Sequence, residues 1–495
     1  MVIIDGHSLT LKEVYNVAFK NERVDIANET LSILKKTRER LEKDIENKTI
    51  YGVNTGFGIL ANKKVEKKEI ELLQENIVKS HAAGVGNPLK VEYVRAVMLI
   101  RANSLCKGYS GIRPIIVKRL VEYINRGICP YVPSQGSVGA SGDLSPLSHI
   151  ALSLIGEGQV FYNGKLIDSK KSLRMNNLEP LTLKAKEGLS LVNGTAFMAG
   201  IGACVTYAAY NLFFEAIKVA AISVDALEGS TSPFDKRVHD VRSHTGQRIV
   251  AGELRKALEN SEIRRSHLDC DRVQDPYTLR AIPQVYGAFY DTLMHVYKTL
   301  EIEVNSATDN PLIFKNGDVI SCGNFHGEPI ALVFDFLSIA LTDMGNMIER
   351  RIDRLVNPKL NDFPAFLTKG SEGLNSGYMI WQYTAAALAS ENKTLAHPAS
   401  ADSIPTSGFQ EDHVSMGAWG ARKLDKIFEN WEKLIAIELM LSYRAIQFRI
   451  PMKSGSIINE ITNELSNILP EDTGDRCYGK DFEIVLEFLL KKADL

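Results

Sequence analysis

The sequence predicts a mainly α-helical protein whose second half is a bundle of long helices. Apolar residues recur there at helical spacing, and polar residues occupy the opposite faces. Long apolar stripes combined with long polar faces are typical of helical bundles. Strand patterns are few and short by comparison. The long helical segments cover about residues 200–228, 283–304, 329–356, 376–395 and 413–449.

Shorter elements are expected in the first half of the chain. In residues 65–80 the apolar positions follow a helical period, and the charged residues fall on the other face. Strand signals occur around residues 159–161 and 165–166, where the intervening Asn163-Gly164 pair favours a tight hairpin turn. Three further segments have the helical period, namely residues 91–107, 115–126 and 145–156.

The length and composition indicate a globular protein with two regions. A chain of 495 residues is long for a single hydrophobic core. We place the boundary near residue 200, which gives one region of residues 1–200 and a second of residues 201–495. The composition, 45% hydrophobic and 24% charged, is that of an ordinary soluble protein. The formal net charge of −2 gives no reason to expect nucleic acid or a membrane as a partner.

The cysteines and the apolar segments favour a cytoplasmic protein. No Cys-x-x-Cys pair occurs, so neither a zinc site nor a disulfide framework is expected. The start of the chain lacks the basic residues and the long apolar core of a signal peptide. The most apolar stretch, residues 330–341, contains Asp335, which favours a buried helix over a membrane span. The six cysteines are Cys106, Cys129, Cys204, Cys270, Cys322 and Cys477.

Residues that can carry chemistry gather where the helical pattern is interrupted. Glycine and proline cluster at these points, as expected for loops that a rigid scaffold presents. The interruptions are residues 51–58, 136–146, 193–195, 274–280, 323–328 and 405–416.

One interruption contains Ala140-Ser141-Gly142, a tripeptide that can close into an electrophilic ring. The Gly142 nitrogen attacks the Ala140 carbonyl and water is lost. A second dehydration removes the Ser141 hydroxyl and leaves 4-methylidene-imidazol-5-one (MIO). Glycine presents an unhindered nitrogen and tolerates a strained turn. The ring would supply an electron sink, for which enzymes usually need a cofactor. An isolated Ala-Ser-Gly is usually a surface turn, so the flanking residues decide the interpretation.

The flanks of the tripeptide extend the pattern to Gly-Ser-Val-Gly-Ala-Ser-Gly-Asp-Leu-Ser-Pro-Leu, residues 136–147. This segment resembles the signature of the histidine and aromatic amino-acid ammonia-lyases, and the resemblance runs from about Ile4 to Arg449. It implies the mainly α, fumarase/aspartase-like fold of those enzymes, with the ring in the N-terminal domain and a long helical bundle after it. It also implies that MIO forms autocatalytically from residues 140–142, with no external cofactor.

The resemblance assigns catalytic roles to three residues in other loops. Tyr51 opens Tyr-Gly-Val-Asn-Thr-Gly-Phe-Gly and would be the base. This role requires a tyrosine pKa lowered from about 10 by positive charge or hydrogen-bond donors. The glycines do not form a phosphate cradle, because no G-x-G-x-x-G and no lysine-serine pair is present. Asn193, in Leu-Val-Asn-Gly-Thr, would hydrogen-bond the ring, and Phe325 would lie beside it.

The segment Val-Gln-Asp-Pro-Tyr-Thr-Leu-Arg, residues 273–280, supplies a partner for the substrate carboxylate. The planar fork of Arg280 can make two charge-assisted hydrogen bonds to a carboxylate. By resemblance, Gln274 and the catalytic Tyr277 add hydrogen bonds to the substrate or the ring. Unmatched, an arginine here would more often form an ion pair on a helix surface.

No metal is expected, although two segments contain histidine and acidic residues. His-Gly-Glu at residues 326–328 lacks ligand spacing on a helix face. Glu411-Asp412-His413 resembles a segment that helps to build the site of histidine ammonia-lyases without a metal. Gln410, directly before this run, is expected to bind substrate.

Two positions favour histidine as the substrate. Ser80-His81 stands where relatives acting on phenylalanine tend to have Phe-Leu and those acting on tyrosine His-Leu, and it resembles the histidine branch. Glu391 matches the acidic residue that this branch places near the imidazole. A neutral imidazole carries one donor and one acceptor, so its pocket must be polar. Taken separately, His81 could be a core histidine and Glu391 a solvated helix residue.

Three aromatic residues depart from the histidine branch. Trp381 and Tyr383 add bulk to a helix near the site, and Phe409 replaces an asparagine beside it. This bulk either improves packing or reshapes the pocket for a different or larger amino acid.

The resemblance implies conversion of L-histidine to trans-urocanate and ammonia by a homotetramer whose active sites draw on more than one subunit. One alternative is an ammonia-lyase for tyrosine or phenylalanine. Another is a 2,3-aminomutase, which returns ammonia to the β-carbon; this partition depends on product residence and lid mobility. A third is a scaffold without activity, which is disfavoured because Tyr51, residues 140–142, Asn193, Tyr277 and Arg280 are all intact.

Overall fold

The computed structural model describes residues 1–46, 48–268 and 273–495 and is mainly helical, as the sequence predicts. Cys270 lies outside the described residues. The chain divides into two compact units. Unit 1 comprises Met1–Tyr207, Val296–Asp335 and Pro398–Lys423, and unit 2 comprises Ala208–His295, Phe336–His397 and Leu424–Leu495.

Most divisions between the units fall inside long helices, and one follows α16 (Met379–Leu395), so neither unit is one stretch of sequence. The expected cut near residue 200 lies close to Tyr207, where the first segment of unit 1 ends, but a single cut leaves out its two later segments. The assignment of the ring to residues 1–200 and of the oligomer surface to residues 201–495 stays a prediction. The divided helices are α9 (Ala196–Ala226), α14 (Ile282–Glu303), α15 (Glu328–Val356) and α17 (Gly417–Gln447).

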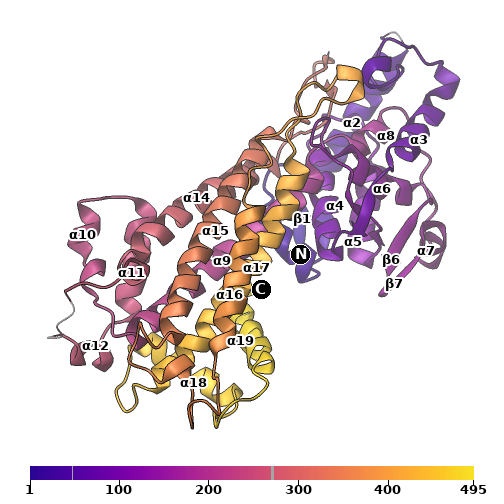
Figure 1. Cartoon of the computed structure of the whole chain (residues 1–495). Coiled ribbons are helices and arrows are strands. Elements are labelled where there is room, and N and C mark those ends of the chain that lie inside the picture. The colour runs from indigo at the N-terminus through magenta and orange to yellow at the C-terminus, as the bar shows by residue number, and fades with distance from the viewer. Residues whose placement is uncertain (47, 269–272) are drawn as a thin grey trace. The chain divides into compact units, whose positions relative to one another are not determined.

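Unit 1 contains short helices arranged around α4 (Val91–Cys106), whose residues from Tyr93 onward are all buried. Helix α4 packs against α1 and α5, while α3, α6 and α8 pack against one another (Figure 1). Helix α5 begins with Pro114 and ends at Gly127, which has a left-handed φ of 65°, a common pairing of start and stop residues. The other helices are α1 (Leu11–Phe19), α2 (Asn28–Ile45), α3 (Ile70–His81), α5 (Pro114–Arg126), α6 (Leu144–Leu154), α7 (Ser169–Met175) and α8 (Glu187–Val192).

The strands of unit 1 form four small sheets. The predicted hairpin is present: Asn163 and Gly164 have φ values of 49° and 72° and join two antiparallel strands, β6 and β7. β4 adds to β6, β3 pairs with β5, β8 pairs with β9, and β1 and β2 pair in parallel. The strands are β1 (Val2–Ile4), β2 (Val24–Ile26), β3 (Val85–Pro88), β4 (Cys129–Pro130), β5 (Pro133–Gln135), β6 (Gln159–Tyr162), β7 (Lys165–Asp168), β8 (Leu312–Ile313) and β9 (Val319–Ile320).

Unit 2 is a helical bundle in which parts of α14, α15 and α17 run alongside α16 (Figure 1). Phe213, Phe289 and Trp431 stack in its core, with ring centroids 5.2 and 5.6 Å apart. Fully buried Arg351 donates to Glu438 over 2.6 Å, so both charges are paired inside the bundle. The other helices are α10 (Lys236–Asp240), α11 (Thr245–Ala257), α12 (Glu262–Ser266), α13 (Tyr277–Arg280), α16 (Met379–Leu395), α18 (Ser456–Ile468) and α19 (Gly479–Lys492).

Two helices, α9 and α15, are long and apolar enough to cross a membrane by length and composition alone. Within the protein, however, 83% and 67% of their most apolar windows are buried. Asp335, in the apolar stretch of α15, is itself buried and accepts hydrogen bonds from Ser400 and Lys423. Most of residues 330–341 is therefore buried, as expected, although Leu332, Phe336 and Ile339 are exposed.

Candidate active site

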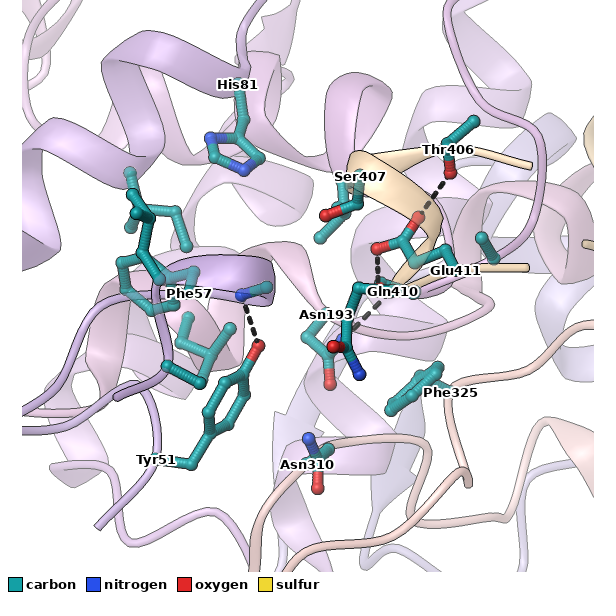
Figure 2. A pocket seen from close by; sticks show the side chains of 18 of the residues that line it. Tyr51, Phe57, His81, Asn193, Asn310, Phe325, Thr406, Ser407, Gln410 and Glu411 are labelled. Atoms are coloured by element: carbon teal, nitrogen blue, oxygen red, sulfur yellow. Dashed lines mark hydrogen bonds between the residues drawn. The ribbon is translucent and has the colours of Figure 1, made fainter. Parts of the chain in front are cut away.

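A cavity of about 860 Å³ in unit 1 brings together segments that lie far apart in the sequence. Its wall is formed by the loop that starts at Tyr51, the end of α3, the tripeptide turn and two later loops around Phe325 and Gln410 (Figure 2). Eight of the expected site residues line it: Tyr51, Ser80, His81, Ala140, Ser141, Asn193, Phe325 and Gln410.

Ala140-Ser141-Gly142 lies in the turn between β5 and α6, where the hydroxyl and the carbonyl of Ser141 are both hydrogen-bonded. The Ser141 hydroxyl donates to Oε1 of Glu411 over 2.6 Å, and Nδ2 of Asn193 donates to the Ser141 carbonyl over 2.8 Å. Gly142 has a φ of +71°, and a Cβ at this position would collide with the backbone of Gly194. Only glycine fits at this point of the turn.

Asp143 anchors the tripeptide turn to the start of α9. Its backbone N–H donates to the Gly194 carbonyl over 2.8 Å, and its buried carboxyl accepts from Ser137 Oγ over 2.8 Å and from Met198 N over 3.1 Å. Burial raises the pKa of Asp143 to about 7, although these hydrogen bonds act in the opposite direction. The anchor therefore changes its charge near neutral pH.

The Tyr51 hydroxyl points into the cavity and accepts a hydrogen bond from the backbone N–H of Gly58 over 3.1 Å (Figure 2). The ring of Phe57 stands edge-on to Tyr51 at 6.5 Å. Buried Gln74, on α3, donates to the carbonyl of Gly52 over 3.0 Å and accepts from α8 through its other amide atom. The tyrosine loop is thus tied to two helices of unit 1.

Ser80 and His81 lie at the end of α3, where the cavity wall is polar. The Ser80 hydroxyl is 3.0 Å from Nδ1 of His81. Burial lowers the pKa of His81, while the charge of Glu411 acts in the opposite direction. Just beyond, the backbone N–H of Gly84 donates to Nε2 of His149 over 3.1 Å, which fixes the chain after α3. The lowered pKa shifts His81 towards the uncharged imidazole.

Glu411 has a more direct place in the site than the sequence indicates. Its second oxygen accepts from Thr406 Oγ1 over 2.8 Å, so that each carboxylate oxygen is bound, one by Ser141 (Figure 2). The neighbouring rings of His326 and His413 stack at 5.7 Å. Within the described parts of the chain, no group of three or more His, Cys, Asp or Glu side chains is placed to hold a metal ion.

Several residues that line the cavity were not among the expected site residues. Oδ1 of Asn310 accepts from the backbone N–H of Cys322 over 2.7 Å and from Ser321 Oγ over 3.3 Å, so its Nδ2 is left for the cavity. Ser407 packs on the tyrosine loop, where a Cβ on Gly58 would lie 2.6 Å from its hydroxyl. The sequence signal for Asn310 is the Asp-Asn-Pro run at residues 309–311, which forms a polar break after a long helix.

The sequence matches a family model over residues 9–467, and that model describes aromatic amino acid lyases. The chain belongs to the aromatic amino acid lyase family. As a member it is a carbon–nitrogen lyase, so the predicted family and reaction class are confirmed.

Individual members of this family resemble the chain over almost its whole length. A histidine ammonia-lyase of Geobacillus sp. (strain WCH70) is 47% identical over 99% of this chain and 96% of its own. Among solved structures, tyrosine aminomutase from Streptomyces globisporus has a TM-score of 0.94 and 39% identity, and covers 99% of this chain and 97% of its own. Histidine ammonia-lyase from Trypanosoma cruzi has a TM-score of 0.92 and 41% identity, and covers 100% and 95%.

Four expected site residues of this aromatic amino acid lyase belong to unit 2 instead. Tyr277 is 74% exposed, and the Arg280 guanidinium lies 4.6 Å from the centre of its ring. Glu391, on α16, is exposed and accepts from Asn430 Nδ2 over 2.8 Å. Gln274 is also exposed. None of these four residues is among the described residues that line the cavity of unit 1. Their roles in the active site therefore stay predictions.

The three aromatic residues at which this lyase differs from the histidine branch have different surroundings. Trp381 packs against Phe482 of α19, with ring centroids 5.2 Å apart, which accounts for its bulk through packing in unit 2. Tyr383 is 62% exposed and Phe409 80% exposed, with a left-handed φ of +67° at Phe409. For these two no packing partner among the described residues explains the aromatic ring.

Proposed function

We propose that this lyase deaminates L-histidine to trans-urocanate and ammonia, with MIO formed from Ala140-Ser141-Gly142 as its electrophile. The observation that carries the proposal is the cavity in which this tripeptide lies together with Tyr51, His81 and Asn193. Two of the relatives described above are named histidine ammonia-lyases, which supports histidine as the substrate.

The residues around the tripeptide fit an MIO group. Gly142 and Gly194 approach each other without a side chain between them. Asn193 Nδ2 lies on the Ser141 carbonyl, and its buried Oδ1 has no hydrogen-bond partner among the described residues. Glu411 accepts from the hydroxyl that ring formation removes. Once formed, the group supplies the electrophile that makes the α-amino group a leaving group.

Tyr51 removes the β-proton in this proposal. A tyrosine acts as a base only when its phenolate is stabilised, and the Gly58 N–H donates directly to the phenolic oxygen. Because Gln74 ties this loop to α3 and α8, the hydroxyl keeps its direction into the cavity. Phe325, on the opposite wall, limits the space in which the substrate can turn (Figure 2).

His81 and Ser80 recognise the imidazole of the substrate. Burial favours the uncharged imidazole of His81, which offers one ring nitrogen as a donor or acceptor while Ser80 engages the other. Gln410 adds an amide on the far wall. These groups meet the need of a histidine side chain for polar partners in a pocket.

In this proposal the enzyme assembles as a homotetramer, and each active site draws on more than one subunit. The assembled site includes Gln274, Tyr277 and Arg280, which bind the substrate carboxylate, and also Glu391. The exposure of Gln274, Tyr277 and Glu391 supports this assignment, because exposed groups are free to complete a site on assembly. Nε of Arg280 is buried without a hydrogen-bond partner among the described residues. We place the enzyme in the cytoplasm, since the five described cysteines are all free.

A second candidate function is a 2,3-aminomutase, which the likeness to a tyrosine aminomutase favours. The two reactions share the electrophile and the base and differ in the fate of ammonia. Incubation of the purified enzyme with L-histidine, L-tyrosine and L-phenylalanine separates them, with absorbance and ammonia read together. We expect urocanate and free ammonia from histidine. A β-amino acid as the product, or turnover of tyrosine or phenylalanine with histidine untouched, would contradict the proposal.

A further inference from the structure

A buried cation supports the turn that faces the tripeptide. Arg101, on α4, is 2% exposed, and its guanidinium lies directly behind Gly194. A Cβ on Gly194 would be 2.5 Å from Nη1 of Arg101 and 2.6 Å from Oγ1 of Thr308. On its other side Gly194 pairs with Gly142 in a parallel bridge. Gly194 is therefore enclosed between the tripeptide and the Arg101 guanidinium.

Arg101 also fixes the helix that leads into this turn. Helix α8 ends at Val192, so the Ser190 carbonyl falls in its last turn, where the helix supplies no backbone partner. Arg101 donates to this carbonyl through Nε over 2.9 Å and also through Nη2, and Nη1 donates to Thr308 over 3.5 Å. A planar guanidinium holds such acceptors in one fixed geometry. The position of Asn193, directly after α8, depends on these bonds.

An ion pair holds the other side of the same serine. Nζ of Lys186 lies 2.7 Å from Oδ2 of Asp309, and both groups are buried. The Ser190 hydroxyl donates to the same carboxylate oxygen over 2.9 Å. Ser190 is thus held at its hydroxyl by the ion pair and at its carbonyl by Arg101. Because buried charges contribute little net stability, their use here favours a positioning role.

We propose that Arg101 is a positioning residue for ring formation, an inference that rests on the proposed function. By filling the space behind Gly194 and holding Ser190, the guanidinium keeps the residue 193–194 turn pressed on the tripeptide. Residues 193–194 bind the tripeptide segment at two points: Asn193 binds the Ser141 carbonyl, and Gly194 binds the backbone N–H of Asp143. The Gly142 nitrogen is then kept near the Ala140 carbonyl carbon, on which it acts.

Ring formation needs no oxidant and no other reactant. The Gly142 N–H adds across the Ala140 C=O, which forms the C–N bond and a hydroxyl. This hydroxyl leaves as water with the proton of the Ser141 N–H, and a C=N bond forms. Ser141 then loses its Oγ hydroxyl and its Cα proton as a second water, which leaves the methylene. Two waters, about 36 Da, are lost in total.

The test is an intact-mass time course on freshly synthesised chains, with thermal unfolding of each to show that it has folded. The variants are Arg101→Met, Arg101→Lys and Thr308→Val. Arg95→Met is the matched control, because Arg95 lies on the same helix, is 6% exposed and likewise donates to backbone carbonyls, those of Val17 and Ile124.

We expect Arg101→Met to lose the two waters roughly tenfold or more slowly than wild type, since small misplacements of reacting groups cost large factors in rate. Arg101→Lys should show a smaller deficit, and Arg95→Met should lose stability but dehydrate at the wild-type rate. Wild-type dehydration in folded Arg101→Met would overturn the proposal. If that variant does not fold, slowed dehydration in Thr308→Val or Arg101→Lys supports it, and full rates in both overturn it. A wild-type chain that never loses two waters refutes the proposed function instead.

Discussion

At the scale of single residues, the proposed chemistry depends on a few hydrogen bonds made by groups that face the cavity. The Tyr51 hydroxyl accepts a hydrogen bond from the Gly58 N–H. The Ser141 hydroxyl donates to Glu411, and the Ser141 carbonyl accepts from Asn193. None of these bonds closes a hydrophobic core. Removing one of them should therefore change activity much more than stability.

Tyr51→Phe provides the most direct test of the base. The substitution removes the oxygen that takes the proton, and we expect kcat to fall roughly a hundred- to ten-thousandfold. The unfolding temperature should hardly change, because a single hydrogen bond at 3.1 Å is lost. Steady-state kinetics and thermal unfolding check the two parts. Tyr162→Phe, which removes a hydroxyl from a β-strand outside the cavity, is the control. Equal activity in both variants would rule Tyr51 out as the base.

Glu391→Ala tests the histidine assignment. If Glu391 binds the imidazole in the assembled enzyme, kcat/KM for histidine should fall by roughly one to two powers of ten, because a charge-assisted hydrogen bond in a dry pocket is lost. Lys393→Ala, on the same helix and also exposed, should leave kcat/KM unchanged. Unaltered histidine turnover in Glu391→Ala would remove this residue from the substrate site.

At the scale of elements, the site is built where helices begin and end. Asp143 connects the tripeptide turn to the first turn of α9, and Gln74 connects α3 to the tyrosine loop and to α8. A helix start offers unpaired N–H groups, and Asp143 binds one of those of α9. The tripeptide turn and the tyrosine loop are therefore each held by a helix.

Asp143 should make the stability of the chain depend on pH. Burial raises its pKa from 3.8 to about 7, so the folded chain holds this proton more firmly than the unfolded chain. The stability gained from this proton is present in full below about pH 4 and is lost as the pH rises through about 7. Relative to Asp143→Asn, wild type should thus become less stable between these values. Urea unfolding at a series of pH values measures the free energy of unfolding of both proteins. A difference between the two free energies that does not change with pH would contradict the raised pKa.

The elements with strong patterns were predictable, and those fixed by distant partners were not. Helices α4, α5 and α14 begin within one residue of the predicted starts, because apolar periodicity and Pro114 mark them. Strands β1 and β2, of three residues each, pair in parallel across α1 and carry too few residues for a pattern. Asn310 and Cys322 reach the cavity through a chain path between two long helices that no motif marks. Periodicity also cannot reveal Arg101, since α4 is buried on nearly all faces.

At the scale of the whole molecule, the expected site residues separate into two groups. Eight of them line the cavity of unit 1, whereas Gln274, Tyr277, Arg280 and Glu391 belong to unit 2. The proposed homotetramer with shared sites would bring both groups into one site, and closed symmetric assemblies are the usual form of soluble homo-oligomers.

Mixing two inactive variants tests shared sites. Tyr51→Phe removes the proposed base in the cavity of unit 1, and Arg280→Ala removes the proposed carboxylate partner in unit 2. If one site uses both residues from different chains, mixed tetramers contain some sites in which both are intact. Activity should therefore return in part after the two variants are dissociated and reassembled together. Each variant reassembled alone serves as the control, and a fully active monomer in sedimentation would contradict the model.

The mass of the active enzyme tests the central claim most directly, namely that Ala140-Ser141-Gly142 becomes the electrophile. Intact-mass spectrometry is made on the same purified sample that deaminates histidine. The account predicts a chain about 36 Da lighter than its sequence mass, because two waters have left the tripeptide. A fully active enzyme at the unmodified sequence mass would contradict it.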